Sequence, residues 1–260
     1  MSEEICQQDL ANVIKGTHAE LRLKVQKVVE QNELSDIERV EDDIWAQHAE
    51  NVMSSDQKSY AKAMGTLAND VWEGDDGSQS RIDWIKRHLD KYFYEHDHIR
   101  FEERMERKLM YLKDQPLSEE KVNFNFDEKV SVLDVGSCYN PFGKFSNYQV
   151  VAIDLSPSPE ISDVFQCDFV NVNVAPNTDN KSRLIFDENG RIESISSNSF
   201  DAVVFCLLLE YLPLARLRHR VCQKAFRVLK NRGIFVIVTP DSSHQGKNLD
   251  QVFRSQTYST

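Results

Sequence analysis

Three carboxylates and one glycine each stand at the end of a short apolar run, where side chains of these types could bind a polar ligand. Asp134 and Gly136 follow the first run, Asp154 closes the second 20 residues after Asp134, and Asp168 closes the third. Continuous apolar runs of this kind are typical of parallel strands that are buried on both faces. In open α/β sheets the ligand binds beyond the carboxyl ends of the strands. We therefore expect these four residues to converge at one edge of a sheet.

Each of these residue types has a physical role at such an edge. Glycine lacks a Cβ, so the backbone at Gly136 can turn sharply and approach a ligand closely. The Asp154 carboxylate can accept charge-assisted hydrogen bonds from both hydroxyls of a ribose. Asp168 can accept from an adenine amino group, with Phe169 against the ring. Asp134 can either hold its own loop or bind an ammonium group.

The strands that position these residues alternate with helices. Five apolar runs rich in β-branched residues span 129–135, 149–154, 163–168, 200–208 and 233–239. A helix from Pro213 to Lys230 lies between the last two, and this alternation predicts a parallel, doubly wound sheet. A hairpin is expected over 183–195, with its turn at Asn189-Gly190.

The first half of the chain predicts helices and no strand. Apolar residues recur at spacings of three and four in segments around 10–29, 37–45, 60–71, 82–93 and 105–112. Ser35 and Glu38 form a capping-box pair at the start of the second segment. We therefore expect an acidic all-helical domain over residues 1–121 and an α/β domain over residues 122–260.

The charge is uneven along the chain and argues against a nucleic-acid partner. The 42 acidic and 31 basic residues give a net charge of −11. Residues 1–126 hold 17 bases and 27 acids, whereas residues 127–260 hold 14 bases and 15 acids. Phosphate contacts need clustered Lys and Arg, which neither half supplies. The acidic first half is instead the better candidate for a surface that binds proteins.

The cysteines and the N-terminus indicate a cytoplasmic protein. The 5 cysteines form no CxxC pair and no metal-ligand spacing, and their odd number is typical of reduced intracellular thiols. The first ten residues lack the basic and apolar regions of a signal peptide. The longest apolar run, 202–209, is too short to span a bilayer. No metal site and no membrane span are therefore expected.

The motifs resemble two nested families. A glycine and three acids on successive strands resemble the class I S-adenosylmethionine-dependent methyltransferases, which have a Rossmann-like parallel sheet. A dinucleotide dehydrogenase is the nearest rival, but its three-glycine fingerprint needs more than Gly136. Five blocks resemble, in order, the Samtor family of S-adenosylmethionine sensors upstream of TOR complex 1, which is related to a fungal adenine-N1 methyltransferase of ribosomal RNA. They are LDVGSCYNPF from residue 133, AIDL from 152, QCDF from 166, FCLLLEYLP from 205 and VTPDSSHQ from 238.

This resemblance implies a sensor that binds S-adenosylmethionine through its methyltransferase-like domain, with S-adenosylhomocysteine as a product or competing ligand. Such a sensor associates with the GATOR and KICSTOR complexes when the ligand is scarce, which inhibits TOR complex 1 signalling, and ligand binding releases it. Carried over by motif, the ligand residues are Gly136, Asp154, Asp168 and Phe169, with Ser137 and Cys206 beside them.

An active methyltransferase on RNA or protein is the alternative. Enzymes that methylate exocyclic amines commonly carry Asn/Asp-Pro-Pro-aromatic after the fourth strand, where this chain has Cys206 followed by three leucines. That difference disfavours an exocyclic amine as acceptor and leaves ring nitrogens and other acceptors open. No neighbouring base is apparent to activate the Cys206 thiol, which is more typical of a core residue. No catalytic residue is assigned.

Several further features have a structural and a functional interpretation. The aromatic face of Trp84, Tyr92 and Phe93 predicts a helix–helix core or a lid over the ligand, and the basic residues of 216–220 predict a solvated helix face. His244 is expected in an exposed loop on the ligand side. Class I sheets continue past the fifth strand with a helix and an antiparallel pair, so we expect either five principal strands or a truncated form.

Overall fold

The computed structural model of the chain describes residues 7–31, 37–53, 63, 66, 81–95, 129–157, 163–177 and 182–239. The helix expected at 105–112, the cap at Ser35, His244 and the end of the chain after residue 239 lie outside these residues, and these expectations stay predictions. Of the helix expected over 60–71, only Ala63 and Thr66 are described, and both are helical.

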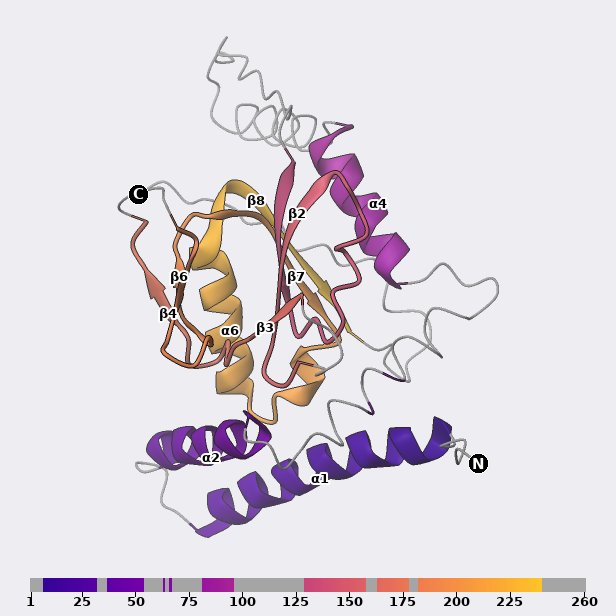
Figure 1. The fold of residues 1–260 in the computed structure, drawn as a ribbon. Coiled ribbons are helices and arrows are strands. Elements are labelled where there is room, and N and C mark those ends of the chain that lie inside the picture. Colours follow the sequence, from indigo (N-terminus) through magenta and orange to yellow (C-terminus); the bar gives the residue numbers. More distant parts are fainter. Residues whose placement is uncertain are drawn as a thin grey trace, which may run out of the picture.

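Five parallel strands form the central sheet in the order β3-β2-β1-β7-β8. The strands are β1 (Val130–Val135), β2 (Tyr148–Asp154), β3 (Val164–Gln166), β7 (Phe200–Cys206) and β8 (Leu229–Val238). All six residues of β1 are buried, which explains its continuous apolar sequence. The chain builds outward from β1 to β3 and then returns to the other side of β1 (Figure 1). The predicted parallel, doubly wound sheet is confirmed.

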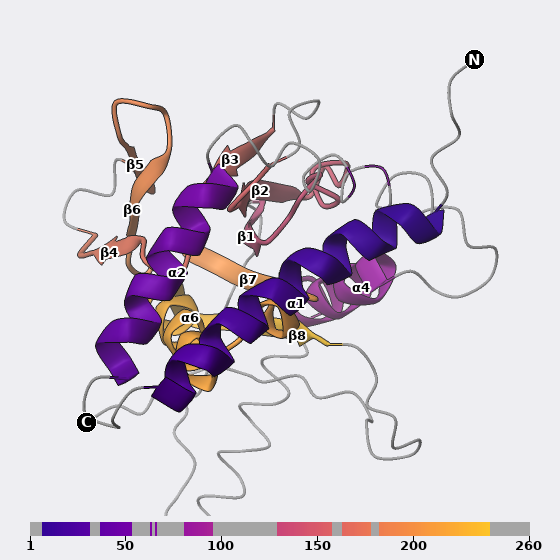
Figure 2. The same cartoon turned by 90° about the horizontal axis from the view of Figure 1, so that it is seen from below.

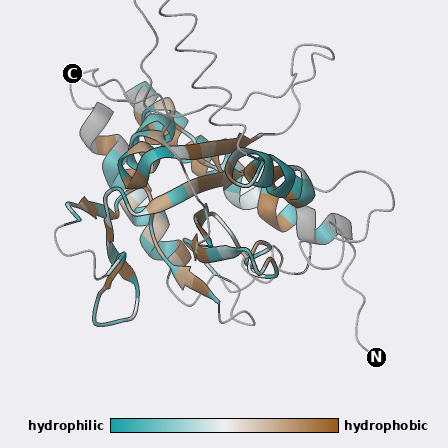
Figure 3. Cartoon of the chain, turned by 90° about the horizontal axis from the view of Figure 1, so that it is seen from above, coloured by the Kyte–Doolittle hydropathy of each residue, from teal (hydrophilic) through white to brown (hydrophobic). Residues whose placement is uncertain are grey.

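Helices α4 (Arg81–Phe93) and α6 (Ala215–Val228) cover opposite faces of this sheet (Figure 1). Each helix buries a stripe of residues spaced by about one turn. The stripes are Ile85, Leu89, Tyr92 and Phe93 in α4, and Leu217, Val221, Ala225 and Val228 in α6. They belong to two separate core clusters, one on each side of the sheet. Figure 3 shows the same pattern as hydrophobic strands between amphipathic helices.

The aromatic face predicted in the first half packs on the sheet. Tyr92 and Phe93 are buried among residues of β1, β7 and β8, and Trp84 packs partly buried against them. The face is therefore part of the core, but the predicted helix–helix packing is wrong, because these residues pack on the sheet. None of the three aromatic side chains lines a cavity described below.

Helices α1 (Gln7–Gln31) and α2 (Ile37–Met53) lie across the carboxyl ends of the central strands (Figure 1, Figure 2). Leu21, Val25, Trp45 and Ala49 of these helices belong to the same core cluster as residues of β1, β2 and β7. The two helices thus share a core with the sheet, and the proposed domain boundary at residue 122 stays a prediction. Within the described part of the chain, no helix combines the length and apolar character that a membrane crossing requires.

A second, three-stranded sheet has the order β4-β6-β5. It consists of β4 (Asn173–Ala175), β5 (Leu184–Phe186) and β6 (Ile192–Ser196). The antiparallel β5–β6 pair confirms the predicted hairpin, whereas β4, parallel to β6, was not predicted.

The turn of this hairpin differs from the predicted two-residue turn. Only Gly190, at φ +76°, is left-handed, whereas a tight Asn-Gly turn needs positive φ at both central residues. Asp187 organises a longer loop, because its Oδ1 accepts from the backbone N–H of Asn189 at 2.9 Å and of Arg191 at 2.8 Å.

Candidate functional site

A cavity of about 110 Å³ lies between the carboxyl ends of the strands and helices α1 and α2. Gly136, Asp154, Asp168 and Phe169 line it from the sheet side, and His18, Trp45 and His48 line it from the helices. The Phe169 ring lies edge-on to Phe205, with 5.9 Å between the ring centroids. The sheet edge therefore brings together the residues that the sequence predicted to converge.

A second cavity of about 50 Å³ adjoins the first. Gly136, Cys138, Leu207 and Tyr211 line both, so these residues form the wall that the two cavities share. The second cavity is further lined by Arg81, Asp134, Ser137, Tyr139 and Cys206. All six residues that the resemblance carried over as ligand residues or neighbours thus line one or the other of these two neighbouring cavities.

The turn after β1 depends on Gly136. Its φ of +76° is left-handed, and its N–H donates to the Ile153 carbonyl at 2.8 Å. An added Cβ would lie 3.0 Å from Cδ1 of Leu208, which is tighter than ordinary packing. The Ser137 hydroxyl closes the same turn by accepting from the Asn140 N–H at 3.1 Å. The backbone therefore passes the cavity wall where a side chain would not fit without movement.

Leu207, directly after β7, also has a left-handed backbone, with φ +59°. This conformation is unfavourable for a residue with a Cβ and is held here by the N–H of Leu207, which donates to the Val238 carbonyl at 2.9 Å. The strained residue lines both cavities.

The Asp154 carboxylate is held in a fixed orientation with acceptor capacity left over. Its Oδ2 accepts from the Cys138 N–H at 3.1 Å and its Oδ1 from the Ser156 N–H at 2.8 Å. A carboxylate oxygen has two acceptor positions, so each oxygen retains one. Burial raises the pKa of Asp154, and these two hydrogen bonds oppose that rise. The arrangement suits a pair of neighbouring hydroxyl groups.

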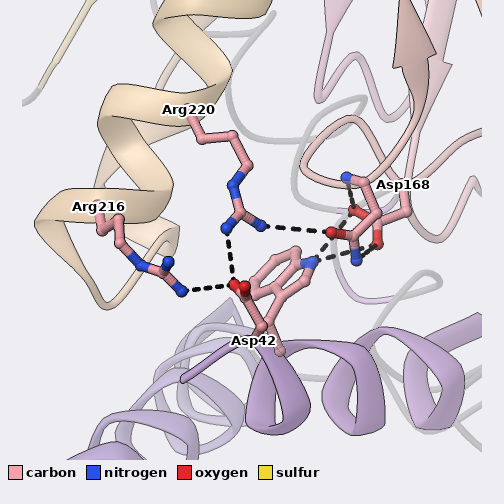
Figure 4. A network of polar contacts seen from close by, with 6 residues as sticks. Asp42, Asp168, Arg216 and Arg220 are labelled. Carbon is pink, nitrogen blue, oxygen red and sulfur yellow. Dashed lines mark hydrogen bonds and ion pairs between the residues drawn. The ribbon is translucent and has the colours of Figure 1, made fainter. Parts of the chain in front are cut away.

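Asp168 is the centre of a polar network that joins the sheet to α2 (Figure 4). Nε1 of Trp45 lies 3.1 Å from both carboxylate oxygens, and the Val170 N–H donates to Oδ1 at 3.0 Å. Asn171 donates its Nδ2–H to Oδ2 at 2.8 Å and its backbone N–H to Oδ1 at 3.4 Å. Burial raises the pKa of Asp168, while the bonds from Trp45, Asn171 and Val170 lower it.

Asp134 is the most deeply buried acid of the site, with 2 % of its surface exposed. Its pKa is raised to about 7, mainly by burial, while a hydrogen bond from Ser137 opposes the rise and the nearby Asp154 charge adds to it. Its Oδ2 has no hydrogen-bond partner among the described residues. An unsatisfied buried carboxylate oxygen of this kind suits a cationic donor. Arg81 lines the same cavity and carries a positive charge, opposite to that of an ionised Asp134.

Two imidazoles line the first cavity from the helices. The ring centroids of His18 and Tyr211 are 4.2 Å apart, and those of His48 and Trp45 are 5.6 Å apart. Burial lowers the pKa of both histidines to about 4, and for His18 the positive charge of His48 contributes as well. Both rings are therefore neutral near pH 7.

The two cysteines that line the second cavity are not reactive thiols. Burial raises the pKa of Cys206 to about 12, and Cys138, which faces both cavities, also has its pKa raised to about 12. A thiol is nucleophilic only when it ionises, so neither serves as a nucleophile near neutral pH. Among the described residues, no group of His, Cys, Asp and Glu is arranged to hold a metal ion.

The prediction that the basic residues of α6 form a solvated face is wrong for two of them. Arg216 and Arg220 each place Nη2 2.7 Å from Oδ1 of Asp42 on α2, and Arg220 also reaches Oδ1 of Asn171 at 3.5 Å (Figure 4). Only His219 of this cluster is exposed. These arginines therefore link α6 to α2 through ion pairs instead of forming a face that contacts only solvent.

Sequence reasoning missed the part of the site that comes from the helices. His18, Trp45, His48 and Arg81 line the cavities, but in the sequence Trp45 belongs to an apolar stripe and the other three have no motif around them. The spacing of Asp42, Trp45 and His48, one helical turn apart, shows that they share one side of α2 and is the sequence feature that could have drawn attention to them.

Comparisons with known proteins agree with this geometry. Residues 133–237 match the family model described as a methyltransferase domain. The chain is 32% identical over 257 residues to the S-adenosylmethionine sensor upstream of mTORC1 of Danio rerio. Proteins of the same name from Xenopus laevis and Xenopus tropicalis are 31% and 30% identical over 262 and 270 residues.

These alignments cover 93% to 95% of this chain and 62% of each relative, so the chain spans less than two thirds of the length of these relatives. The resemblance that the motifs predicted is confirmed over nearly the whole chain. The chain thus has a class I methyltransferase-like α/β fold and is a relative of the S-adenosylmethionine sensors upstream of mTORC1.

Proposed function

We propose that this chain binds S-adenosylmethionine across the two cavities and senses it upstream of TOR complex 1. The observation that carries the proposal is the convergence of Gly136, Asp154 and Asp168 on one cavity, at the carboxyl ends of β1, β2 and β3 and beneath α1 and α2. Open α/β sheets bind ligands at this edge. Similarity to sensors of the same ligand supports the choice of S-adenosylmethionine.

The two cavities suit the two ends of this ligand. In the first, Asp154 would accept from the ribose hydroxyls and Asp168 from the adenine amino group, next to Phe169. In the second, Asp134 would accept from the ammonium group and Arg81 would bind the carboxylate of the methionine end. Gly136 lines both cavities, and Ser137 and Cys206 line the second. S-adenosylhomocysteine shares both ends and would compete.

A sensor also needs a surface that changes when the ligand binds. Helices α1 and α2 line the cavity with His18, Trp45 and His48, so a bound ligand contacts elements that also reach the outside of the molecule. A ligand shifts a conformational equilibrium only by its difference in affinity for the two states. We expect the GATOR and KICSTOR complexes to bind in the cytoplasm when the ligand is scarce, and to be released when it binds.

Calorimetric titration with S-adenosylmethionine tests the binding site. The D154N variant keeps the size of the side chain but loses the charge, so we expect at least tenfold weaker binding, because hydrogen bonds to a charged group contribute about 1.5–3 kcal/mol each. D43N, at an exposed position of α2, is the matched control and should bind like the wild type. Unchanged binding by D154N, or no binding by the wild-type chain, would contradict the proposal.

Co-precipitation tests the sensor function. The wild-type chain should capture GATOR and KICSTOR subunits from extract depleted of S-adenosylmethionine and release them when the ligand is added. The D154N chain should capture them at every ligand concentration. Capture that is insensitive to ligand in the wild type, while titration shows that the ligand binds, would reject the sensor and leave the binding site standing.

The alternative function is methyl transfer to RNA or protein, and the match to a methyltransferase domain over 133–237 favours it. Formation of S-adenosylhomocysteine during incubation with cellular RNA or protein would establish it. Because the Cys206 thiol is protonated near neutral pH, a C206S variant should leave any such activity within about twofold.

A further inference from the structure

We propose that Trp45 takes the hydrogen-bonding position at Asp168 that an adenine amino group would need, so that ligand binding and the attachment of α2 compete. The inference rests on the proposed function, because it assumes that the adenine end of S-adenosylmethionine approaches Asp168. It adds Trp45 to the residues that control ligand binding, and it predicts that ligand binding weakens the attachment of α2.

The first argument is that the Asp168 carboxylate is already surrounded by donors. An ionised carboxylate offers about four lone-pair positions. Nε1–H of Trp45, the backbone N–H of Val170 and Nδ2–H of Asn171 donate to it, and the backbone N–H of Asn171, 3.4 Å from Oδ1, is shared with the Asp168 carbonyl at 3.1 Å. Asp168 differs in this from Asp154, whose two oxygens accept one bond each. An additional N–H from a ligand therefore competes with these donors for the carboxylate.

The second argument identifies the donor that leaves. The backbone N–H groups of Val170 and Asn171 belong to the same turn as Asp168, two and three residues further on, and stay with it. Trp45 is 123 residues away in the sequence and divides its single hydrogen between both oxygens, at 3.1 Å each. A shared hydrogen makes two weaker bonds in place of one strong bond. Trp45 is thus the donor that an adenine amino group replaces.

The third argument connects Trp45 to the outside of the molecule. Asp42 lies one turn before Trp45 on α2 and pairs with Arg216 and Arg220 of α6 at 2.7 Å. Arg220 also contacts Asn171, which donates to Asp168, so the contacts form a closed ring that starts and ends on α2 (Figure 4). We call this ring of Asp42, Trp45, Asp168, Asn171 and Arg220, together with Arg216, which pairs with Asp42, the α2 clasp.

The α2 clasp predicts how the apparent affinity for the ligand should change in variants. If the binding-competent state requires Trp45 to leave Asp168, the apparent affinity is the intrinsic affinity multiplied by the fraction of molecules in which the α2 clasp is open. Weakening the clasp should therefore strengthen ligand binding, and ligand binding should loosen α2 in return. A residue that simply contacts the ligand behaves in the opposite way, because its loss weakens binding.

Calorimetric titration of the full chain with S-adenosylmethionine decides between these outcomes. W45F keeps a ring for packing and removes the N–H, and we expect it to bind about tenfold more tightly. D42N, at a side chain that is 42% exposed, should bind about threefold more tightly without endangering the fold. D43N, its exposed neighbour, and W84F, on α4 away from both cavities, are matched controls that should stay within twofold of the wild type.

A second readout follows Trp45 itself. The indole N–H resonance of Trp45, assigned by its loss in W45F, should move upfield when S-adenosylmethionine is added, because it leaves a charged acceptor. That of Trp84 should stay in place. Weaker or equal binding by W45F, or by D42N should W45F not fold, would overturn the inference while the proposed function stands. Absence of binding by the wild-type chain would overturn the proposed function and, with it, this inference.

Discussion

Two glycines of this chain share one backbone conformation in different surroundings. Gly136 and Gly190 both have φ +76°, but a Cβ at Gly136 would meet Leu208 at 3.0 Å, whereas a Cβ at Gly190 would meet nothing within 4 Å. Residues with a Cβ lose about 1–2 kcal/mol in this conformation. The pair therefore separates the effect of backbone strain from the effect of the cavity wall.

We expect G190A to lower the free energy of unfolding in urea by about 1–2 kcal/mol, and G136A to lower it by more, because Leu208 must also shift. Only G136A should also weaken S-adenosylmethionine binding, by about tenfold, because Leu208 must shift at the cavity wall. Normal binding by G136A in a titration would show that the close approach at residue 136 serves the turn alone.

The buried acid Asp134 makes the stability of the fold depend on pH. Its pKa in the folded chain is about 7, above the ordinary value of 3.8, so between these values the folded state binds the proton more tightly than the unfolded state. The contribution of this group to stability therefore falls as the pH rises through that window, and the penalty is complete above pH 7.

The D134N variant removes this penalty while keeping the size of the side chain. It should gain about 1–3 kcal/mol more stability relative to the wild type at pH 8 than at pH 5, measured by urea unfolding at both values. We also expect weaker S-adenosylmethionine binding at pH 8, because the ammonium group loses its partner. An equal difference at both pH values would mean that Asp134 does not ionise in the folded chain.

At the scale of elements, hydrogen bonds from helix α6 hold the segment that follows β3 in place. Arg220, Lys224 and Arg227, spaced by about one turn, reach Asn171, the Val172 carbonyl and the Val174 carbonyl. Burial lowers the pKa of Lys224 to about 8, and the nearby Asp168 carboxylate opposes this shift. The basic residues of α6 thus hold the turn that carries Asp168 from its other side.

Removing one of these contacts should loosen that segment locally. R227A should lower stability by about 1 kcal/mol and speed amide exchange over 171–175 by about fivefold, as measured by hydrogen–deuterium exchange. H219A, at the exposed position of the same helix, serves as the control and should change neither. Exchange that is equally slow in R227A would show that the second sheet holds the segment without α6.

The elements also show what the sequence could and could not predict. Fully buried strands such as β1 are visible as apolar runs, and the acids at their ends follow from strand order alone. Strand β4 was missed because it has three residues, of which only Val174 is buried. The partners of Asp168 and Arg216 could not be predicted, because Trp45 and Asp42 are 123 and 174 residues away and meet them only through the packing of α2.

At the scale of the whole molecule, helices α1 and α2 share one of the two core clusters with the sheet. Leu21 of α1 is 3% exposed within the cluster that includes β1, β2 and β7 residues, whereas Leu23, two residues on, is 55% exposed. Folding of α1 should therefore be coupled to folding of the sheet, even though the sequence divides the chain near residue 122.

The two leucines test this coupling. L21A should lower the free energy of unfolding by about 2–5 kcal/mol, whereas L23A should change it by less than about 0.5 kcal/mol. Tryptophan fluorescence and far-ultraviolet circular dichroism should report one coincident transition in urea. Two separate transitions, with L21A affecting only one of them, would show that the helical region unfolds independently.

The left-handed Leu207 has a consequence for protein engineering. Exchange of this residue for glycine would relieve its backbone strain, so a selection for heat resistance alone should favour L207G. The same exchange would delete a side chain that lines both cavities. Thermostable variants of this chain obtained without a ligand present would therefore tend to lose recognition first at this apolar position, before any of the acids at the strand ends changes.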